Sequence, residues 1–172
     1  MNFVEFVREN KASLLQGWFE WILSNYPEPS RKYILNKDAP FTNPIGYNVY
    51  NCLLKILETI HEANFSSLEF ERAIEGILKI RTLEGLDPWT SVNIFEYLWK
   101  RYCEQSINCS DINDVIQSFD FYEKLVAVSL KKYVEIKERI AEIQKNEIRN
   151  RYGKILDRLN EKYSLLKDET NE

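Results

Sequence analysis

The chain has 172 residues with a formal net charge of −4, 44% hydrophobic residues and 29% charged residues. This length suffices for one domain with its own core, and the composition excludes a disordered chain. No run approaches the roughly 20 apolar residues of a membrane span, and five glycines and five prolines are too few for the turns of an all-β fold. The sequence therefore predicts an all-α protein.

Prolines and capping residues divide the first two thirds of the chain into helices. Apolar residues at helical spacing predict a first helix, which the prolines of YPEPS end. Thr42 or Asn43 can cap a helix whose first residue is Pro44, and Asp87-Pro88 repeats this arrangement. The predicted helices span about residues 3–25, 44–62, 66–83 and 88–104.

The C-terminal third has the composition of one long helix. After Asp111 there is no proline, Gly153 is the only glycine, and apolar residues recur every three or four positions, with a slip near residues 143–148. At about 1.5 Å per residue such a helix is longer than the preceding domain is wide, so its far half must pack on another chain, another domain or nothing. We predict a helical domain over residues 1–120 and a long helix, with coiled-coil potential, over residues 121–172.

Charge differs between these parts. Residues 1–130 contain 12 Lys/Arg and 18 Asp/Glu, whereas residues 131–163 contain 10 and 6. The basic residues of segment 145–162 are interleaved with acids, which is typical of a solvated helix flank rather than of a nucleic-acid-binding surface. We therefore predict no nucleic-acid partner and no membrane insertion.

The N-terminal sequence and the cysteines bear on location. MNFVEFVRENK has neither the basic nor the apolar segment of a secretory signal, which predicts a cytoplasmic protein. Cys52, Cys103 and Cys109 form an odd set without C-x-x-C spacing. We interpret them as reduced structural thiols.

Candidate chemistry centres on His61, the only histidine, which lies one turn from Leu57. A neutral histidine is the usual proximal haem ligand in globins, but a lone histidine on an apolar helix face is more often a packed residue. Glu71 and Glu75 are i,i+4 neighbours without the Glu-x-x-His pairs of di-iron bundles. The sequence also lacks a P-loop, a G-x-G-x-x-G loop and a nucleophile elbow. It therefore predicts a protein that is not an enzyme and holds no metal or cofactor.

Three segments, in order, carry a family resemblance: GWFEWILSNYP, FTNPIGYNVYNCLLKILETI and AIEGILKIRTLEGLDPWTSVNIFEYLWKRY. Together they resemble the N-terminal domain of RsbR-type stressosome co-antagonists, the RsbRD N-terminal family, over about residues 8–106. The matching elements are Trp18 or Trp21, Asn43-Pro44, Ile80-Arg81, and the helix start at Pro88–Ser91.

The resemblance implies a dimeric, non-haem, globin-like sensor of stress signal transduction. It makes residues 1–120 the globin-like sensor domain and residues 121–172 the signalling and dimerisation helix. Members of the family place this domain before a signalling helix and a STAS output domain, and no STAS domain fits after residue 106 of this chain. A stand-alone sensor that signals to a regulatory protein partner through its terminal helix fits the sequence better. Similar domains also occur in small proteins of anaerobic sulfur and redox metabolism, so an accessory scaffold in such a system stays open.

A second alternative is a small-molecule-binding protein. Aromatic residues make up 13% of the chain, and at helical spacing they are typical of a core, although they would also line a small apolar pocket. Such a pocket would take a fatty-acid-like ligand or haem. We predict Tyr47, His61 and Arg81 as the candidate ligand-binding residues, while noting that a cap at Asn43 and an ion-paired Arg81 are common structural features.

Overall fold

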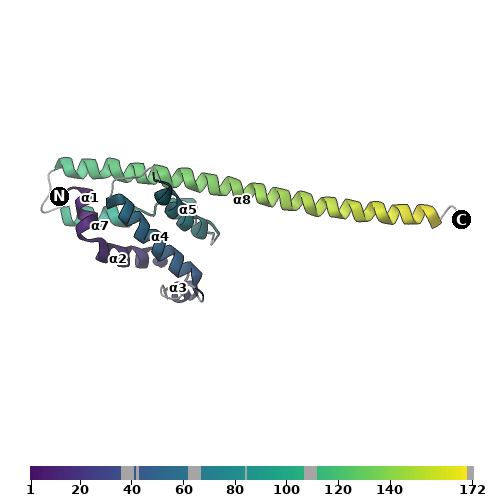
Figure 1. The fold of residues 1–172 in the computed structure, drawn as a ribbon, viewed down its shortest axis with the longest axis horizontal. Coiled ribbons are helices and arrows are strands. Elements are labelled where there is room, and N and C mark those ends of the chain that lie inside the picture. Colours follow the sequence, from purple (N-terminus) through teal and green to yellow (C-terminus); the bar gives the residue numbers. More distant parts are fainter. Residues whose placement is uncertain (36–40, 42, 62–66, 84, 107–111, 170–172) are drawn as a thin grey trace. The chain divides into compact units, whose positions relative to one another are not determined.

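The structure is a computed structural model that describes residues 1–35, 41, 43–61, 67–83, 85–106 and 112–169, with side chains at all of these except 33, 61, 83 and 164–169 (Figure 1). The described residues form eight helices and no strand, which confirms the all-α prediction. In chain order the helices are α1 (Phe3–Glu9), α2 (Lys11–Ser24), α3 (Glu28–Ile34), α4 (Pro44–His61), α5 (Leu68–Leu83), α6 (Pro88–Val92), α7 (Glu96–Ser106) and α8 (Ile112–Glu169).

The chain divides into two compact units, Met1–Ile136 and Lys137–Glu172. Helices α1 to α7 belong to the first unit, and α8 contributes residues to both. Among the described helices, none combines the length and the apolar character that a membrane crossing requires.

The first predicted helix, over residues 3–25, is in fact two helices that meet at Asn10, so the prediction of one continuous helix is wrong. Asn10 ends α1 with φ −109° and ψ 14°. Its side-chain Nδ2 donates to the carbonyl of Phe6 at 3.0 Å and so satisfies an acceptor of the last turn of α1. Apolar spacing continues across this break, which is why periodicity alone does not reveal it.

The predicted helix over residues 88–104 is also divided, into α6 and α7. Its start is as expected, because the amide of Thr90 donates to Asp87 Oδ1 at 2.9 Å. The helix then ends at Asn93, and the indole Nε1 of Trp18 donates to the carbonyl of Ile94 at 2.7 Å. A tertiary hydrogen bond from α2 therefore satisfies a carbonyl that the break frees.

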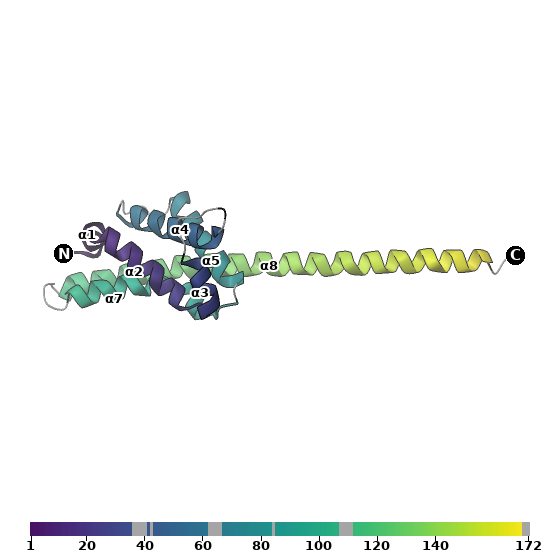
Figure 2. The same ribbon diagram turned by 90° about the horizontal axis from the view of Figure 1, so that it is seen from below.

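Helix α4 is the centre of the first unit. It packs most extensively against α5 and also contacts α1, α2 and α3, while α2 lies beside α7 (Figures 1 and 2). The core between these helices is strongly aromatic, as in the edge-to-face pair of Phe6 and Tyr102, whose ring centres are 5.5 Å apart. The largest fully buried side chains include Trp18, Tyr102, Phe6, Phe19, Phe70 and Phe95.

The start of α4 combines a cap with a close helix contact. The amide of Gly46 donates to Asn43 Oδ1 at 3.1 Å, which confirms Asn43 as a cap, whereas Thr42 lies outside the described residues. A Cβ atom at Gly46 would lie 2.1 Å from the carbonyl oxygen of Ile34, the last residue of α3. Glycine is therefore required here because only a bare Cα lets α3 approach the first turn of α4.

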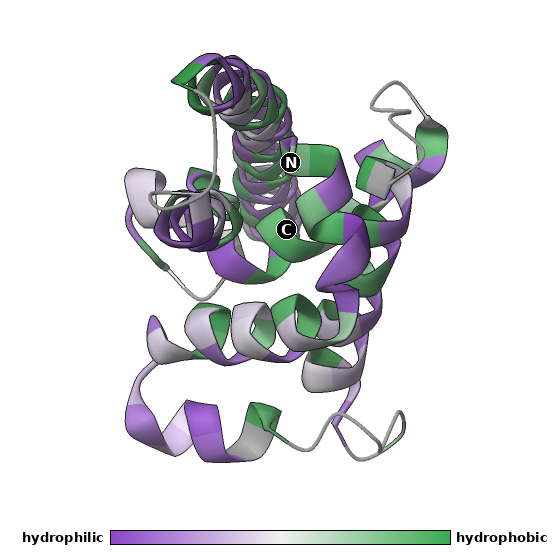
Figure 3. Cartoon of the chain, turned by 90° about the vertical axis from the view of Figure 1, so that its left-hand side faces the viewer, coloured by the Kyte–Doolittle hydropathy of each residue, from purple (hydrophilic) through white to green (hydrophobic). Residues whose placement is uncertain are grey.

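The part of α8 that belongs to the first unit buries one side. The buried side chains there are Ser118, Leu125, Ser129, Tyr133 and Ile136, at spacings of three, four or seven residues. Lys132 Nζ lies 2.9 Å from Glu71 Oε2 of α5 and 3.1 Å from Glu135 Oε2. Figure 3, coloured by hydropathy, shows both hydrophobic and hydrophilic residues along α8. Some of its large apolar side chains are exposed.

Candidate functional site

The three predicted ligand-binding residues have different surroundings. Tyr47, in the first turn of α4, exposes 39% of its surface. His61 is the last residue of α4, and its side chain lies outside the described residues. Arg81, near the end of α5, is completely buried. Their ligand-binding role stays a prediction.

Arg81 joins α5 to α6. One guanidinium nitrogen, Nη2, donates to the carbonyl of Thr90, whereas Nε and Nη1 find no hydrogen-bond partner among the described residues. Burial lowers the pKa of the Arg81 guanidinium, and Tyr26 and Asp87 act in the opposite direction. The contact seen in the structure is therefore a structural link between two consecutive helices.

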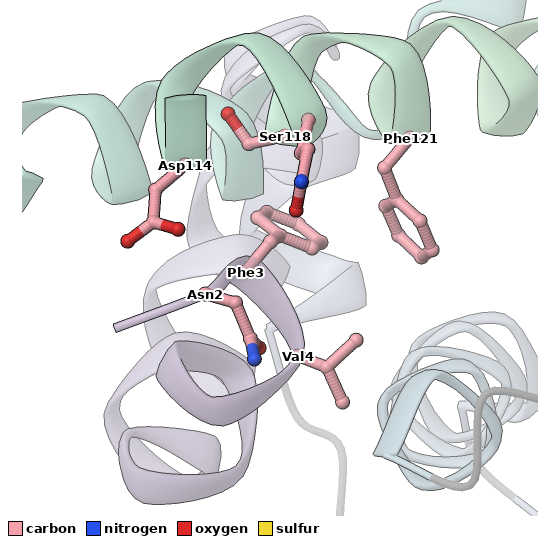
Figure 4. Close-up of a pocket in the computed structure, with 7 residues that line it drawn as sticks. Asn2, Phe3, Val4, Asp114, Ser118 and Phe121 are labelled. Atoms are coloured by element: carbon pink, nitrogen blue, oxygen red, sulfur yellow. The ribbon is translucent and has the colours of Figure 1, made fainter. Parts of the chain in front are cut away.

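A cavity of about 240 Å³ lies between the start of α1 and the start of α8 (Figure 4). Its lining residues are Asn2, Phe3, Val4, Asp114, Gln117, Ser118 and Phe121, which include none of the three predicted residues. Two of the polar groups already bond locally, because the amide of Glu5 donates to Asn2 Oδ1 at 2.9 Å and Ser118 Oγ donates to the carbonyl of Val115 at 2.6 Å. The cavity is also smaller than the roughly 300 Å³ at which ligand pockets usually begin.

The thiols show no sign of activation. Cys52 and Cys103 are free, and burial raises the pKa of both, with Glu104 adding to the effect at Cys103. Cys109 lies outside the described residues. Within the part of the chain that the structure describes, no group of three or more His, Cys, Asp or Glu side chains is placed to hold a metal ion.

A hydrogen bond and an aromatic cluster attach α8 to the break between α6 and α7. The hydroxyl of Tyr122 donates to Asn93 Oδ1, and Asn93 Nδ2 donates to Glu96 Oε2 at 2.7 Å. The ring of Tyr122 also stacks on Trp99 of α7 with 5.1 Å between ring centres. Burial raises the pKa of Tyr122, so the phenol remains a donor at neutral pH. Sequence reasoning missed this contact because its partners are 29 residues apart and follow no motif.

Within the first unit, α8 exposes a row of large apolar side chains on a side next to its buried one. Each exposes between 44 and 73% of its surface. At 3.6 residues per turn they share one side of the helix. We call this set the α8 patch: Ile112, Ile116, Phe119, Leu130 and Val134.

The second unit carries a denser apolar row. Six side chains, each between 49 and 70% exposed, fall within an arc of about 100°. We call them the terminal stripe: Ile148, Tyr152, Ile155, Leu156, Leu159 and Tyr163. Ile143 lies on the opposite side of the helix, so the predicted slip near 143–148 marks a change of face.

The charged residues that border the terminal stripe are basic: Lys145, Arg149, Arg151 and Lys162. The other side of the helix carries charges of both signs: Glu147, Lys154, Asp157, Arg158 and Glu161. The exposed apolar row with basic borders is the feature of the described residues that best fits a binding surface for another protein.

Comparison of the chain with protein-family models, with curated proteins and with solved structures finds no match in any of the three. The resemblance to the RsbRD N-terminal family therefore stays a prediction from the sequence.

Proposed function

We propose that this protein is a non-catalytic sensory or regulatory module that acts by protein–protein contact through α8. The observation that carries the proposal is the terminal stripe, in which six apolar side chains are exposed on one side of a helix. Exposed apolar rows rimmed by charged residues mark interaction surfaces, because leaving such a row in water is unfavourable.

A second copy of the chain is the partner that we propose for this surface. A helix in a protein gains most of its stability by packing an apolar face, and the stripe remains exposed within its own unit. Pairing with another helix would bury the stripe in the way that coiled coils bury theirs. A regulatory protein would then bind the proposed homodimer in a way that depends on the conformation of the dimer.

The contact between Tyr122 and Asn93 supplies a route for an input within the first unit. Asn93 ends α6 beside the carbonyl that Trp18 of α2 contacts, so the break between α6 and α7 is bonded to both α2 and α8. A change in helix packing at this break would alter the hydrogen bond and the ring stacking that attach α8 there. It would thereby shift the equilibrium between alternative positions of α8. This route supports a regulatory role because it connects the aromatic core to the helix that carries the interaction surface.

The sequence resemblance supports the sensory part of the proposal. It adds a globin-like arrangement, a cytoplasmic location and a role in stress signalling, all of which belong to the proposal. Two of the residues that carry the resemblance have structural roles here, because Trp18 is buried in the core and Asn43 caps α4.

Two matched substitutions test the interaction surface. Ile155 and Ile143 are 52 and 53% exposed. Ile155 belongs to the terminal stripe, whereas Ile143 lies on the side of α8 opposite the centre of the stripe. We expect Ile155→Lys to weaken self-association about tenfold or more, because it places a charge in the buried row, and Ile143→Lys to leave it unchanged. Light scattering coupled to size-exclusion chromatography measures the mass across a concentration series. A wild-type chain that is monomeric at high micromolar concentration would overturn the proposed dimer.

A further inference from the structure

Three residues of the α8 patch, continued by the exposed Glu123 and Ala127, have the same spacing as five of the six residues of the terminal stripe when one row is read in reverse. Apolar or small exposed residues of the first turns follow steps of 4, 3, 4 and 4 through positions 112, 116, 119, 123 and 127, with Glu123 as the exception. The terminal stripe follows the same steps in the opposite direction through positions 163, 159, 156, 152 and 148. An antiparallel pair of helices brings such rows into contact residue by residue.

The two surfaces also complement each other in charge. The terminal stripe is bordered by basic residues alone, so two stripes facing each other would bring Arg149 and Arg151 of both copies together. The exposed side of residues 112–127 instead carries Glu123 at its centre and, at one border, Asp120 together with the exposed Lys124. The carboxylate at the centre of this row makes it a better partner for the basic-bordered stripe than a second stripe would be.

We propose that the terminal stripe of one copy docks antiparallel on the exposed side of residues 112–127 in a second copy. In the register set by the common spacing, Leu159 lies opposite Ile116 and Tyr152 opposite Glu123. Arg149 and Arg151 then lie within one helical turn of Glu123, and Arg151 is level with Lys124. The inference rests on the proposed self-association and adds its direction, its register and the surface that receives the stripe.

The proposed register is the same for both copies. It pairs residue 112 with 163 and 127 with 148, and this pairing is unchanged when the two copies are exchanged. Docking one surface onto a different surface of a second copy extends into a filament unless the contact is made twice around a twofold axis. We therefore include the twofold axis in the proposal and expect a dimer of fixed mass rather than a series of larger species.

Cysteine cross-linking distinguishes antiparallel from parallel pairing. In a chain with Cys52, Cys103 and Cys109 replaced by alanine, we introduce Ile116→Cys in one sample and Leu159→Cys in another and treat them with a short bis-maleimide. The two proteins mixed should give a cross-linked dimer, whereas Leu159→Cys alone should give almost none. An equal yield from Leu159→Cys alone, or no product from a mixture that light scattering shows to be dimeric, would overturn the antiparallel contact and leave the homodimer standing. Monomeric mass would overturn both.

Charge reversal tests the register. Glu123→Lys should weaken the dimer about tenfold or more because it faces Arg149 and Arg151, and a partner carrying Arg149→Glu and Arg151→Glu should restore it. Asp157→Lys changes the net charge equally but lies off the stripe, so it should have no effect. Equal weakening by Asp157→Lys, or a lack of rescue by the double charge reversal, would contradict the proposed register.

Discussion

At the scale of single residues, Gly46 shows how a motif that resembles a site entrance acts in packing. TNPIG contains a helix cap and a proline at the first helical position, and both are recognisable from the sequence. The glycine is explained only by the carbonyl of Ile34, which reaches the place of its missing side chain. No sequence pattern predicts this contact, because it depends on how α3 packs against the first turn of α4.

Substitution of Gly46 measures how much the close contact between α3 and α4 contributes to the stability of the fold. We expect Gly46→Ala to lower the free energy of unfolding by about 1–3 kcal/mol, since the new Cβ would force α3 away from α4. Gly153→Ala is the matched control, because a Cβ there meets no atom within 4 Å. Urea denaturation followed by circular dichroism gives both values. An unchanged urea denaturation midpoint for Gly46→Ala would contradict this prediction, because it would show that α3 moves away from α4 without loss of stability.

At the scale of helices, the sequence predicts where most elements lie and fails where an asparagine interrupts a periodic pattern. Asn10 and Asn93 each end a helix inside a predicted longer one. The side chain of each asparagine donates a hydrogen bond there, and beside Asn93 the carbonyl of Ile94 accepts a further one from Trp18. Asparagine has only a modest helix penalty, so its presence in an apolar pattern is a weak signal. The long terminal helix was predictable because it contains no proline and only one glycine, Gly153.

The ion pair between α5 and α8 has a testable pH dependence. The hydrogen bond and charge of Lys132 lower the pKa of Glu71 below its usual 4.5. A lowered folded-state pKa stabilises the folded chain above the unfolded pKa, and this stabilisation is lost as pH falls through the folded value. We therefore expect Glu71→Gln to flatten the loss of stability below about pH 4.5, with Glu69→Gln as the neighbouring control. The thermal unfolding midpoints of the wild type and of both variants, measured across the acid pH range, test this expectation. Three curves of midpoint against pH that coincide would refute it.

At the scale of the whole molecule, stability and association are expected to reside in different parts of the chain. The buried core lies within the first unit, whose last buried residue is Ile136, whereas the terminal stripe lies in the second. From the sequence, the acidic body and the basic helix already indicated this division, while the basic borders of the terminal stripe emerged only once helix faces were assigned.

Deletion of residues 145–172 separates these two properties. We expect the shortened chain to retain the thermal midpoint of the first unit to within a few degrees, because it keeps every core side chain. Its mass by light scattering should be that of a monomer, because the terminal stripe is gone. A shortened chain that stays dimeric would place the interface in the first unit instead.

The stacking of Tyr122 on Trp99 gives the protein an intrinsic fluorescent reporter. Trp18 is buried in the core and Trp89 is 63% exposed, so soluble quenchers reach the indoles unequally. Trp99 lies against a ring of α8, and its emission depends on the distance and orientation of that ring. In a chain carrying Trp89→Phe, any stimulus that shifts α8 relative to α7 would be visible as a change in emission, without an attached dye and before the stimulus is chemically identified.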